Sequence, residues 1–256
     1  MPKFFLKKES IQRGRVVIGG EDAYHIAKVL RMRPGERTEA TDGEGTLYKL
    51  KLTKIASQLV EGEVVSAGRD RAEPSMQVHL FQSVLKGEKM DWVLQKGTEI
   101  GVHSFHPFIS QRTVVRKELA AYEKKRARWE RIVAEAAKQS GRGQIPSVKP
   151  VIMAKELKTA CSGTVALVAW EAEKATSLKQ YLRSRPELKA VSAVIGPEGG
   201  FSADEIMEFT DWGITPVSLG PRIFRAETAG PVLAALLLYE YGEMEPTQPR
   251  VTSDDQ

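Results

Sequence analysis

The chain has 256 residues, enough for one large or two smaller domains, and its 41% hydrophobic content is ordinary for a globular protein. A single cysteine excludes an internal disulfide and favours a reducing compartment, and no apolar run is long enough to span a membrane. The N-terminus is too charged and too poor in apolar residues for a signal peptide, so we expect a cytoplasmic protein.

Charge is distributed unevenly around the net value of +5. Residues 86–142 carry an excess of six positive charges, whereas residues 143–256 carry an excess of four negative charges. A basic first half and an acidic second half suit a polyanion-binding surface joined to a separate pocket. The alternative is that these Lys and Arg side chains only solvate helix faces, and charge alone leaves both open.

The first 70 residues have the pattern of a small β-barrel. A helix is expected at residues 22–31, with Asp22 as its N-cap, and Asp42-Gly43 is a hairpin signal. Short, partly alternating runs indicate strands at residues 16–18, 37–41, 45–52 and 59–65.

Residues 68–74 are polar and lack periodicity, which indicates a linker. Beyond them strand and helix patterns alternate, which predicts an α/β domain with a largely parallel sheet. The expected strands are residues 78–81, 104–109, 164–170 and 191–195, and the expected helices are residues 88–100, 118–139, 204–209 and 227–241.

A glycine-rich loop, residues 196–200, follows the apolar run at 191–195. Its three glycines permit positive φ and close approach to a ligand. Ser202 and Glu205 have capping-box spacing, so a helix whose N–H groups could meet an anion begins directly after the loop. A plain strand–turn–helix connection would use the same residues.

A second loop, residues 219–225, contains Arg222 and Arg225, the only cationic residues between positions 190 and 249. Glu227 follows at the start of a helix, where its charge is favoured. An Arg225–Glu227 ion pair is the plain alternative. Together the two loops indicate one small-molecule pocket.

Several common sites are absent from the sequence. There is no phosphate-binding G-x-x-x-x-G-K-[ST], no dinucleotide G-x-G-x-x-G after a strand, and no H-E-x-x-H. His103 and His106 have no cysteine partner nearby, so no metal site is expected.

Residues 195–202 and 219–229 resemble the two late motifs of the ribosomal RNA small subunit methyltransferase E family, within the SPOUT class of knotted methyltransferases. Residues 25–36, 89–101 and 135–142 resemble earlier segments of that family in the same order. The resemblance therefore covers nearly the whole chain.

The chain departs from the family pattern at three positions. Phe224, Ala226 and Gly97 stand where the family usually has Leu, Thr and Ala. Any role of a threonine hydroxyl at position 226 is lost, and Gly97 should weaken its helix slightly.

The resemblance implies a PUA-like RNA-binding β-barrel at residues 1–70, an α/β SPOUT methyltransferase domain with a trefoil knot at residues 74–245, and a flexible tail at residues 246–256. It also implies that S-adenosylmethionine binds in the knot, mostly to backbone groups of three loops. The cofactor-binding residues so implied are Trp170, Ile195, Gly196, Glu198, Gly199, Gly200, Leu219, Gly220, Arg222 and Ile223.

The implied reaction is methylation of N3 of one uridine in 16S rRNA of the small ribosomal subunit, by a homodimer with the pocket near the subunit interface. Uridine N3 must lose a weakly acidic proton. Arg225 is the candidate for stabilising the developing negative charge, and Glu227 for orienting Arg225 or acting as base. The residues expected to hold RNA are Arg31, Arg33, Lys86, Arg112, Arg116 and Arg142.

Three alternatives remain at this level. The same machinery could methylate a different nucleotide. The chain could be an RNA-binding protein without catalysis, or an α/β enzyme that binds another phosphate-bearing ligand at residues 196–200.

Overall fold

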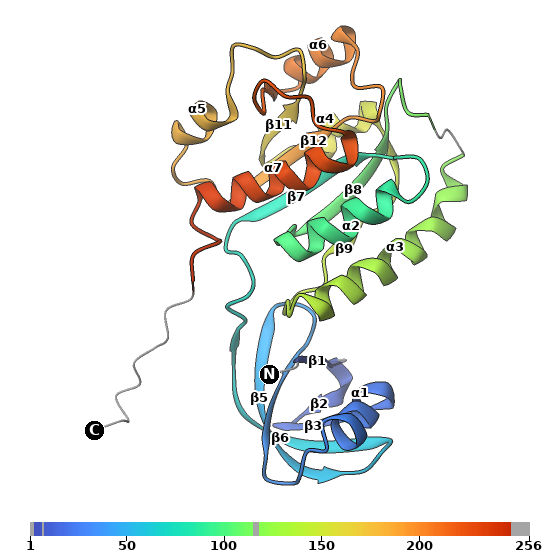
Figure 1. The fold of residues 1–256 in the computed structure, drawn as a ribbon, viewed down its shortest axis with the longest axis vertical. Helices are drawn as coiled ribbons and strands as arrows, with labels where there is room; N and C mark the ends of the chain where they lie inside the picture. Colours follow the sequence, from blue (N-terminus) through green and yellow to red (C-terminus); the bar gives the residue numbers. More distant parts are fainter. Residues whose placement is uncertain (1–2, 7, 115–117, 247–256) are drawn as a thin grey trace.

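The computed structural model describes residues 3–6, 8–114 and 118–246. The chain forms a small β domain followed by a larger α/β domain (Figure 1). The expected tail at residues 246–256 lies, apart from Pro246, outside the described residues. No helix within the described ranges has the length and apolar character needed to cross a membrane.

The β domain is one curled sheet of six strands in the order β1-β4-β5-β6-β3-β2. All neighbouring strands are antiparallel except the parallel pair β1 and β4. Apolar side chains from alternate positions, such as Val16, Ile18, Leu50 and Leu52, form its own core. The strands are β1 (Lys3–Phe5), β2 (Ile11–Gln12), β3 (Arg15–Gly19), β4 (Arg37–Thr41), β5 (Thr46–Ile55) and β6 (Leu59–Arg69).

One helical segment covers this sheet. It consists of α1 (Gly20–Tyr24) and a π-helical stretch (His25–Val29), with a 3-10 turn (Lys8–Ser10) earlier in the chain. The predicted N-cap, Asp22, is wrong: Gly19 occupies that position and Asp22 lies in the first turn. Carboxylates are favoured both at the N-cap and in the first turn of a helix, so the residue type alone cannot separate the two positions.

The α/β domain contains a fully parallel sheet in the order β10-β8-β7-β12-β11-β13, with β9 beside β8. The alternating pattern in the sequence predicted this class of domain. The strands are β7 (Gln77–Ser83), β8 (Ser104–Ile109), β9 (Ser147–Val148), β10 (Ile152–Met153), β11 (Val165–Ala169), β12 (Ala190–Ile195) and β13 (Ile214–Val217).

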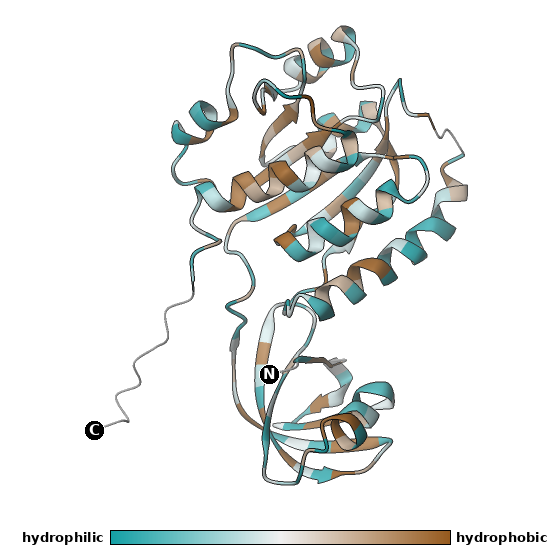
Figure 2. Cartoon of the chain, viewed as in Figure 1, coloured by the Kyte–Doolittle hydropathy of each residue, from teal (hydrophilic) through white to brown (hydrophobic). Residues whose placement is uncertain are grey.

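Helices pack on both faces of the sheet because its central strands are apolar on both sides. On β7, Leu80 joins the core under α2, α3 and α7, whereas Phe81 joins the core under α4 and α6. Figure 2 shows hydrophobic colour on the central strands and hydrophilic colour along much of α3. The helices are α2 (Lys89–Ile100), α3 (Ala120–Gln139), α4 (Leu157–Ala160), α5 (Leu178–Arg183), α6 (Ala203–Asp211) and α7 (Ala226–Glu240), with a 3-10 turn at Ala154–Glu156.

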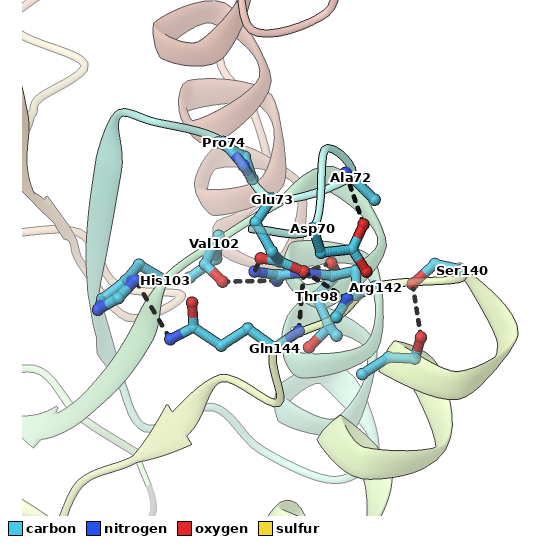
Figure 3. A network of polar contacts seen from close by, with 12 residues as sticks. Asp70, Ala72, Glu73, Pro74, Thr98, Val102, His103, Ser140, Arg142 and Gln144 are labelled. Carbon is cyan, nitrogen blue, oxygen red and sulfur yellow. Dashed lines mark hydrogen bonds and ion pairs between the residues drawn. The ribbon is translucent and has the colours of Figure 1, made fainter. Parts of the chain in front are cut away.

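The junction between the domains, where a linker is expected at residues 68–74, contains a buried polar network. Gly68 and Arg69 still belong to β6, and Asp70 and Glu73 are buried. Figure 3 shows the carboxylate of Glu73 facing the guanidinium of Arg142, with 2.7 Å between Oε2 and Nη2. The trefoil knot stays a prediction, because strand order does not establish how the chain threads.

Candidate cofactor pocket and active site

A cavity of about 370 Å³ opens where β11, β12 and β13 end. Its size is within the range of small-molecule sites, and the carboxyl ends of parallel strands are where open α/β sheets bind ligands. All the predicted cofactor-binding residues except Gly199 line it, together with Arg225 and Glu227. The structure therefore brings the two loops to one place.

The first loop leaves β12 at Ile195 and enters α6 through a capping box. The Ser202 hydroxyl accepts from the Glu205 backbone N–H at 3.1 Å, and a Glu205 carboxylate oxygen accepts from the Ser202 N–H at 3.0 Å. Gly200 has φ +64°, and an added Cβ there would lie 2.6 Å from Oε1 of Glu171. Glycine at this position is therefore required by both the backbone and its neighbour.

Gly199 lies on the outer side of the same loop. Its carbonyl accepts a hydrogen bond of 3.1 Å from the guanidinium of Arg112, which also reaches the Phe201 carbonyl at 3.4 Å. These hydrogen bonds hold the glycine-rich loop in place from the side of Arg112. Gly199 therefore helps to position the loop but does not line the cavity.

The second loop lines the cavity and ends at α7. Gly220 has φ +108°, and Arg222 and Ile223 are exposed, the latter by 82%. Arg225 is the N-cap residue of α7, and its carbonyl accepts from the N–H groups of Thr228 and Ala229 at 2.9 Å. The Arg225 side chain makes no capping hydrogen bond, and Arg225 is an exposed residue that lines the cavity.

Glu227 lies in the first turn of α7 and is mostly buried, with 17% of its side chain exposed. The alternative ion pair with Arg225 is not formed among the described residues. Glu227 instead approaches Lys89, whose Nζ is 3.4 Å from Oε2. Oε2 is buried and has no hydrogen-bond partner.

Lys89 was not predicted as a site residue. It begins α2 and lines the cavity, with Nζ also 3.4 Å from Oε1 of Glu198. It is separated from both carboxylates by more than a hundred residues of sequence, so no local spacing could have revealed it. The position of residues 89–101 within the family resemblance was the only available signal.

Glu198 is held by several donors at the edge of the cavity. Burial alone would raise the pKa of its carboxyl, but hydrogen bonds from backbone N–H groups, including that of Lys86 at 3.1 Å, and the charge of Lys89 lower that pKa overall. Glu198 is therefore an ionised group at neutral pH.

The predicted RNA-binding residues do not form one cluster. Arg31 and Arg33 are exposed on the β domain, whereas Lys86 and Arg112 are exposed beside the glycine-rich loop. Arg116 lies outside the described residues.

Arg142 has a different role from the one predicted. Only 3% of it is exposed, and its guanidinium donates to Glu73 and to the carbonyls of Thr98 and Val102. Four of its five N–H groups are engaged within the protein and the side chain is buried, so the structure argues against RNA binding by Arg142.

The histidines lie away from the cavity, and the described residues contain no group of three or more His, Cys, Asp or Glu placed to hold a metal ion. His106 stacks on Phe81 and shares the Ser104 hydroxyl with His79. Burial lowers the pKa of His106 to about 4, so it packs as a neutral ring.

Two family models match the chain in sequence order. An RNA methyltransferase PUA domain matches residues 18–71, and an RNA methyltransferase domain matches residues 72–238. The boundary between the two matches falls at the junction described above.

Relatives match over almost the full length. The ribosomal RNA small subunit methyltransferase E of Bacillus subtilis is 32% identical over 237 residues, which is 90% of this chain and 93% of that protein. A Neisseria gonorrhoeae protein of the same name, solved with S-adenosylmethionine bound, is 32% identical with a TM-score of 0.79 and covers 93% of this chain and 97% of its own. A Legionella pneumophila protein solved with the same cofactor is 29% identical with a TM-score of 0.75 and covers 93% and 96%.

Proposed function

The chain belongs to the ribosomal RNA small subunit methyltransferase E family, and from that premise we propose that it transfers a methyl group from S-adenosylmethionine to N3 of one uridine in 16S rRNA. The observation that carries the proposal is that the glycine-rich loop, Arg225 and Glu227 line one cavity at the ends of β11, β12 and β13.

The residues of this cavity fit S-adenosylmethionine. The cofactor combines a positively charged sulfur, a carboxylate and an aromatic base, and the lining offers carboxylates, arginines and the apolar side chains of Trp170 and Leu219. Gly200 permits a close backbone approach that a Cβ would obstruct. We propose that residues 170–171, 195–200 and 219–223 hold the cofactor, largely through backbone groups.

S-adenosylmethionine, when bound, supplies a methyl group on a positively charged sulfur. Uridine N3 loses its proton and forms a bond to the methyl carbon as the carbon–sulfur bond breaks, with its electron pair going to sulfur. Arg225 stabilises the negative charge that develops on the base. Glu227 accepts the proton. Two features favour this role: its Oε2 has no hydrogen-bond partner, and among the described residues Glu227 forms no ion pair with Arg225.

RNA contact is assigned to the exposed cations around the cavity and on the β domain. Lys86 and Arg112 flank the cavity, and Arg31 and Arg33 lie on the β domain. Phosphate contacts of this kind position RNA without reading its sequence. A base within structured RNA must leave its stack to reach the methyl group. We further propose that the enzyme acts in the cytoplasm as a homodimer.

The test is transfer of radiolabelled methyl from S-adenosylmethionine to small ribosomal subunits that lack the modification, followed by nucleoside analysis. Label in 3-methyluridine at a single site is expected. Label in a different nucleoside would favour the same machinery with another target. Cofactor binding without label on subunits or free RNA would refute the assigned substrate, and no cofactor binding would favour a non-catalytic RNA-binding protein.

A further inference from the structure

Lys89 joins three parts of the cavity that are far apart in the sequence. Its Nζ is 3.4 Å from Oε1 of Glu198 in the glycine-rich loop and 3.4 Å from Oε2 of Glu227 on α7. Within the described residues, Lys89 is the only cation that pairs with either carboxylate. The glycine-rich loop after β12, the first turn of α7 and the start of α2 are therefore linked through one ammonium group.

The helix dipole disfavours a lysine at this position. Lys89 is the first residue of α2, a helix of 12 residues, and a positive charge at a helix N-terminus opposes the helix dipole. The first turn contains one acidic residue, Asp91, whose carboxylate is paired with Arg128 on α3. Local stability therefore gives no reason for the lysine, and the reason must lie in what its side chain contacts.

Folding stability does not explain the two ion pairs either. The Lys89 side chain is 36% exposed, and pairs at such positions contribute little net stability because water screens them. Their geometry has a more direct consequence for the site. Because both carboxylate oxygens lie within 3.4 Å of one Nζ, the carboxylates are close enough to repel each other without it.

We infer that Lys89 is a positioning residue that holds the Glu198 and Glu227 carboxylates together and so sets the geometry for methyl transfer. This inference rests on the proposed function. The Lys89 contact to Glu227 has no hydrogen-bond geometry, so Oε2 keeps its capacity to accept the N3 proton. Lys89 thereby holds the Glu227 carboxylate in place and leaves Oε2 available to accept a hydrogen bond or a proton.

The charged groups facing this cavity come from α2, from α7 and from the loops after β11, β12 and β13, and all of them enter the pH dependence. They are Lys89, Glu171, Glu198, Arg222, Arg225 and Glu227.

Removing the ammonium leaves Glu198 and Glu227 facing each other, and a neighbouring like charge raises the pH at which a carboxyl loses its proton. The acid limb of the pH–rate profile must therefore move to higher pH in Lys89→Met.

The test compares Lys89→Met, Lys89→Arg and the control Lys96→Met in methyl-transfer kinetics between pH 5 and 9. Lys96 is on the same helix but pairs with Glu99 outside the cavity. Lys89→Met is expected to lower kcat about tenfold or more, weaken S-adenosylmethionine binding by no more than a few fold, and move the acid limb up by about one pH unit. Lys89→Arg should restore most of kcat, and Lys96→Met should match the wild type.

A second readout needs no RNA. In ¹³C-labelled protein with S-adenosylmethionine bound, the titration of the Glu198 carboxyl, identified by its absence in Glu198→Gln, is expected to move to higher pH in Lys89→Met. This measurement remains decisive if the wild type methylates no rRNA, which would refute the proposed function alone. Unchanged titration of Glu198 and a superimposable pH–rate profile in Lys89→Met would overturn the inference.

If Lys89→Met does not fold, Glu198→Gln tests the same arrangement with the lysine present. Loss of one of the two repelling carboxylates should move the acid limb to lower pH, opposite to the effect of removing Lys89. An acid limb that does not move, or that moves upward, would overturn the inference.

Discussion

Arg225 is a cation at the edge of the cavity for which no ion pair is found among the described residues. Its guanidinium is therefore free to meet an anionic ligand. We expect Arg225→Ala to lower single-turnover methyl transfer by about 10²–10³-fold, the usual effect of removing a donor aimed at developing charge. Binding of S-adenosylmethionine, measured by calorimetric titration, should change by only a few fold.

The matched variant Arg225→Lys keeps the charge but loses the planar fork of donors. Its turnover should fall between those of the wild type and Arg225→Ala. Equal loss of cofactor affinity and turnover in Arg225→Ala would show that the arginine holds the cofactor instead.

Gly200 and Gly213 are both glycines with positive φ, of +64° and +83°, but only Gly200 borders the cavity. A Cβ at Gly200 would meet Oε1 of Glu171, whereas a Cβ at Gly213 would meet nothing within 4 Å. Alanine at either position should cost about 1–2 kcal/mol of stability from backbone strain. Only Gly200→Ala should also weaken S-adenosylmethionine binding, by about tenfold, because Glu171 must move at the cavity edge.

Thermal unfolding with and without S-adenosylmethionine separates the two effects. The cofactor should raise Tm strongly for Gly213→Ala and weakly for Gly200→Ala. The same rise in both variants would mean that the glycine-rich loop does not approach the cofactor.

At the scale of single elements, Gly97 shows packing overriding helix propensity. It lies inside α2, and an added Cβ would be 2.7 Å from Cε1 of Phe105. Alanine at this site gains about 1 kcal/mol of propensity, but overpacking a buried aromatic ring costs about 1–3 kcal/mol. We therefore expect Gly97→Ala to lower the free energy of unfolding in urea by about 1 kcal/mol.

The exposed Gln95 on the same helix serves as the control, since Gln95→Ala changes no buried contact and should stay within about 0.5 kcal/mol of the wild type. A Gly97→Ala variant more stable than the wild type would mean that Phe105 yields easily. The effect of Gly97 on stability would then be explained by its low helix propensity alone, as expected from the sequence.

Elements were predictable where a strong pattern had no competitor. β4 and β8 lie at the predicted residues 37–41 and 104–109. β4 alternates charged residues with Thr and Ala, β8 is rich in buried apolar side chains, and both are bounded by turn residues. β13 was missed because it has four residues, includes Pro216 and lies at the sheet edge, where little burial shapes the sequence.

At the scale of the whole molecule, the limit of sequence reasoning is long-range pairing. The glycine-rich loop was predictable because it is local and follows the predicted strand at residues 191–195. The arginine loop was predictable because Arg222 and Arg225 are the only cations in an acidic segment. Lys89 and Arg142 were not, because their meaning depends on partners brought together only by the fold. A basic residue after a basic helix has the same sequence pattern whether it meets a phosphate or a buried glutamate.

The Glu73–Arg142 pair joins the two domains at this scale. Oε1 of Glu73 accepts the backbone N–H groups of Gly143 and Gln144 at 2.8 and 2.9 Å, and both side chains of the ion pair are at most 5% exposed. The same segment contacts the β domain, where the Thr41 hydroxyl donates to the Gly143 carbonyl. Breaking this pair therefore disturbs the junction from both sides.

We expect Glu73→Ala to cost about 3–5 kcal/mol of unfolding free energy, because it leaves the Arg142 guanidinium buried without a countercharge. Replacing both partners, in Glu73→Met with Arg142→Met, removes the uncompensated charge and should recover part of that loss. Lys54→Ala, which breaks the exposed pair with Glu61, should cost less than about 1 kcal/mol.

Urea unfolding followed separately in each domain gives the decisive comparison. If the network couples the domains, Glu73→Ala should split one transition into two, and the KM for RNA should rise more than the KM for S-adenosylmethionine. The KM for RNA should respond more because the β domain would lose its fixed position. The cavity should respond less because the core of the α/β domain, which supports β11, β12 and β13, stays intact. A single transition with both KM values unchanged would show that the pair contributes stability without setting the relation between the RNA-binding domain and the cavity.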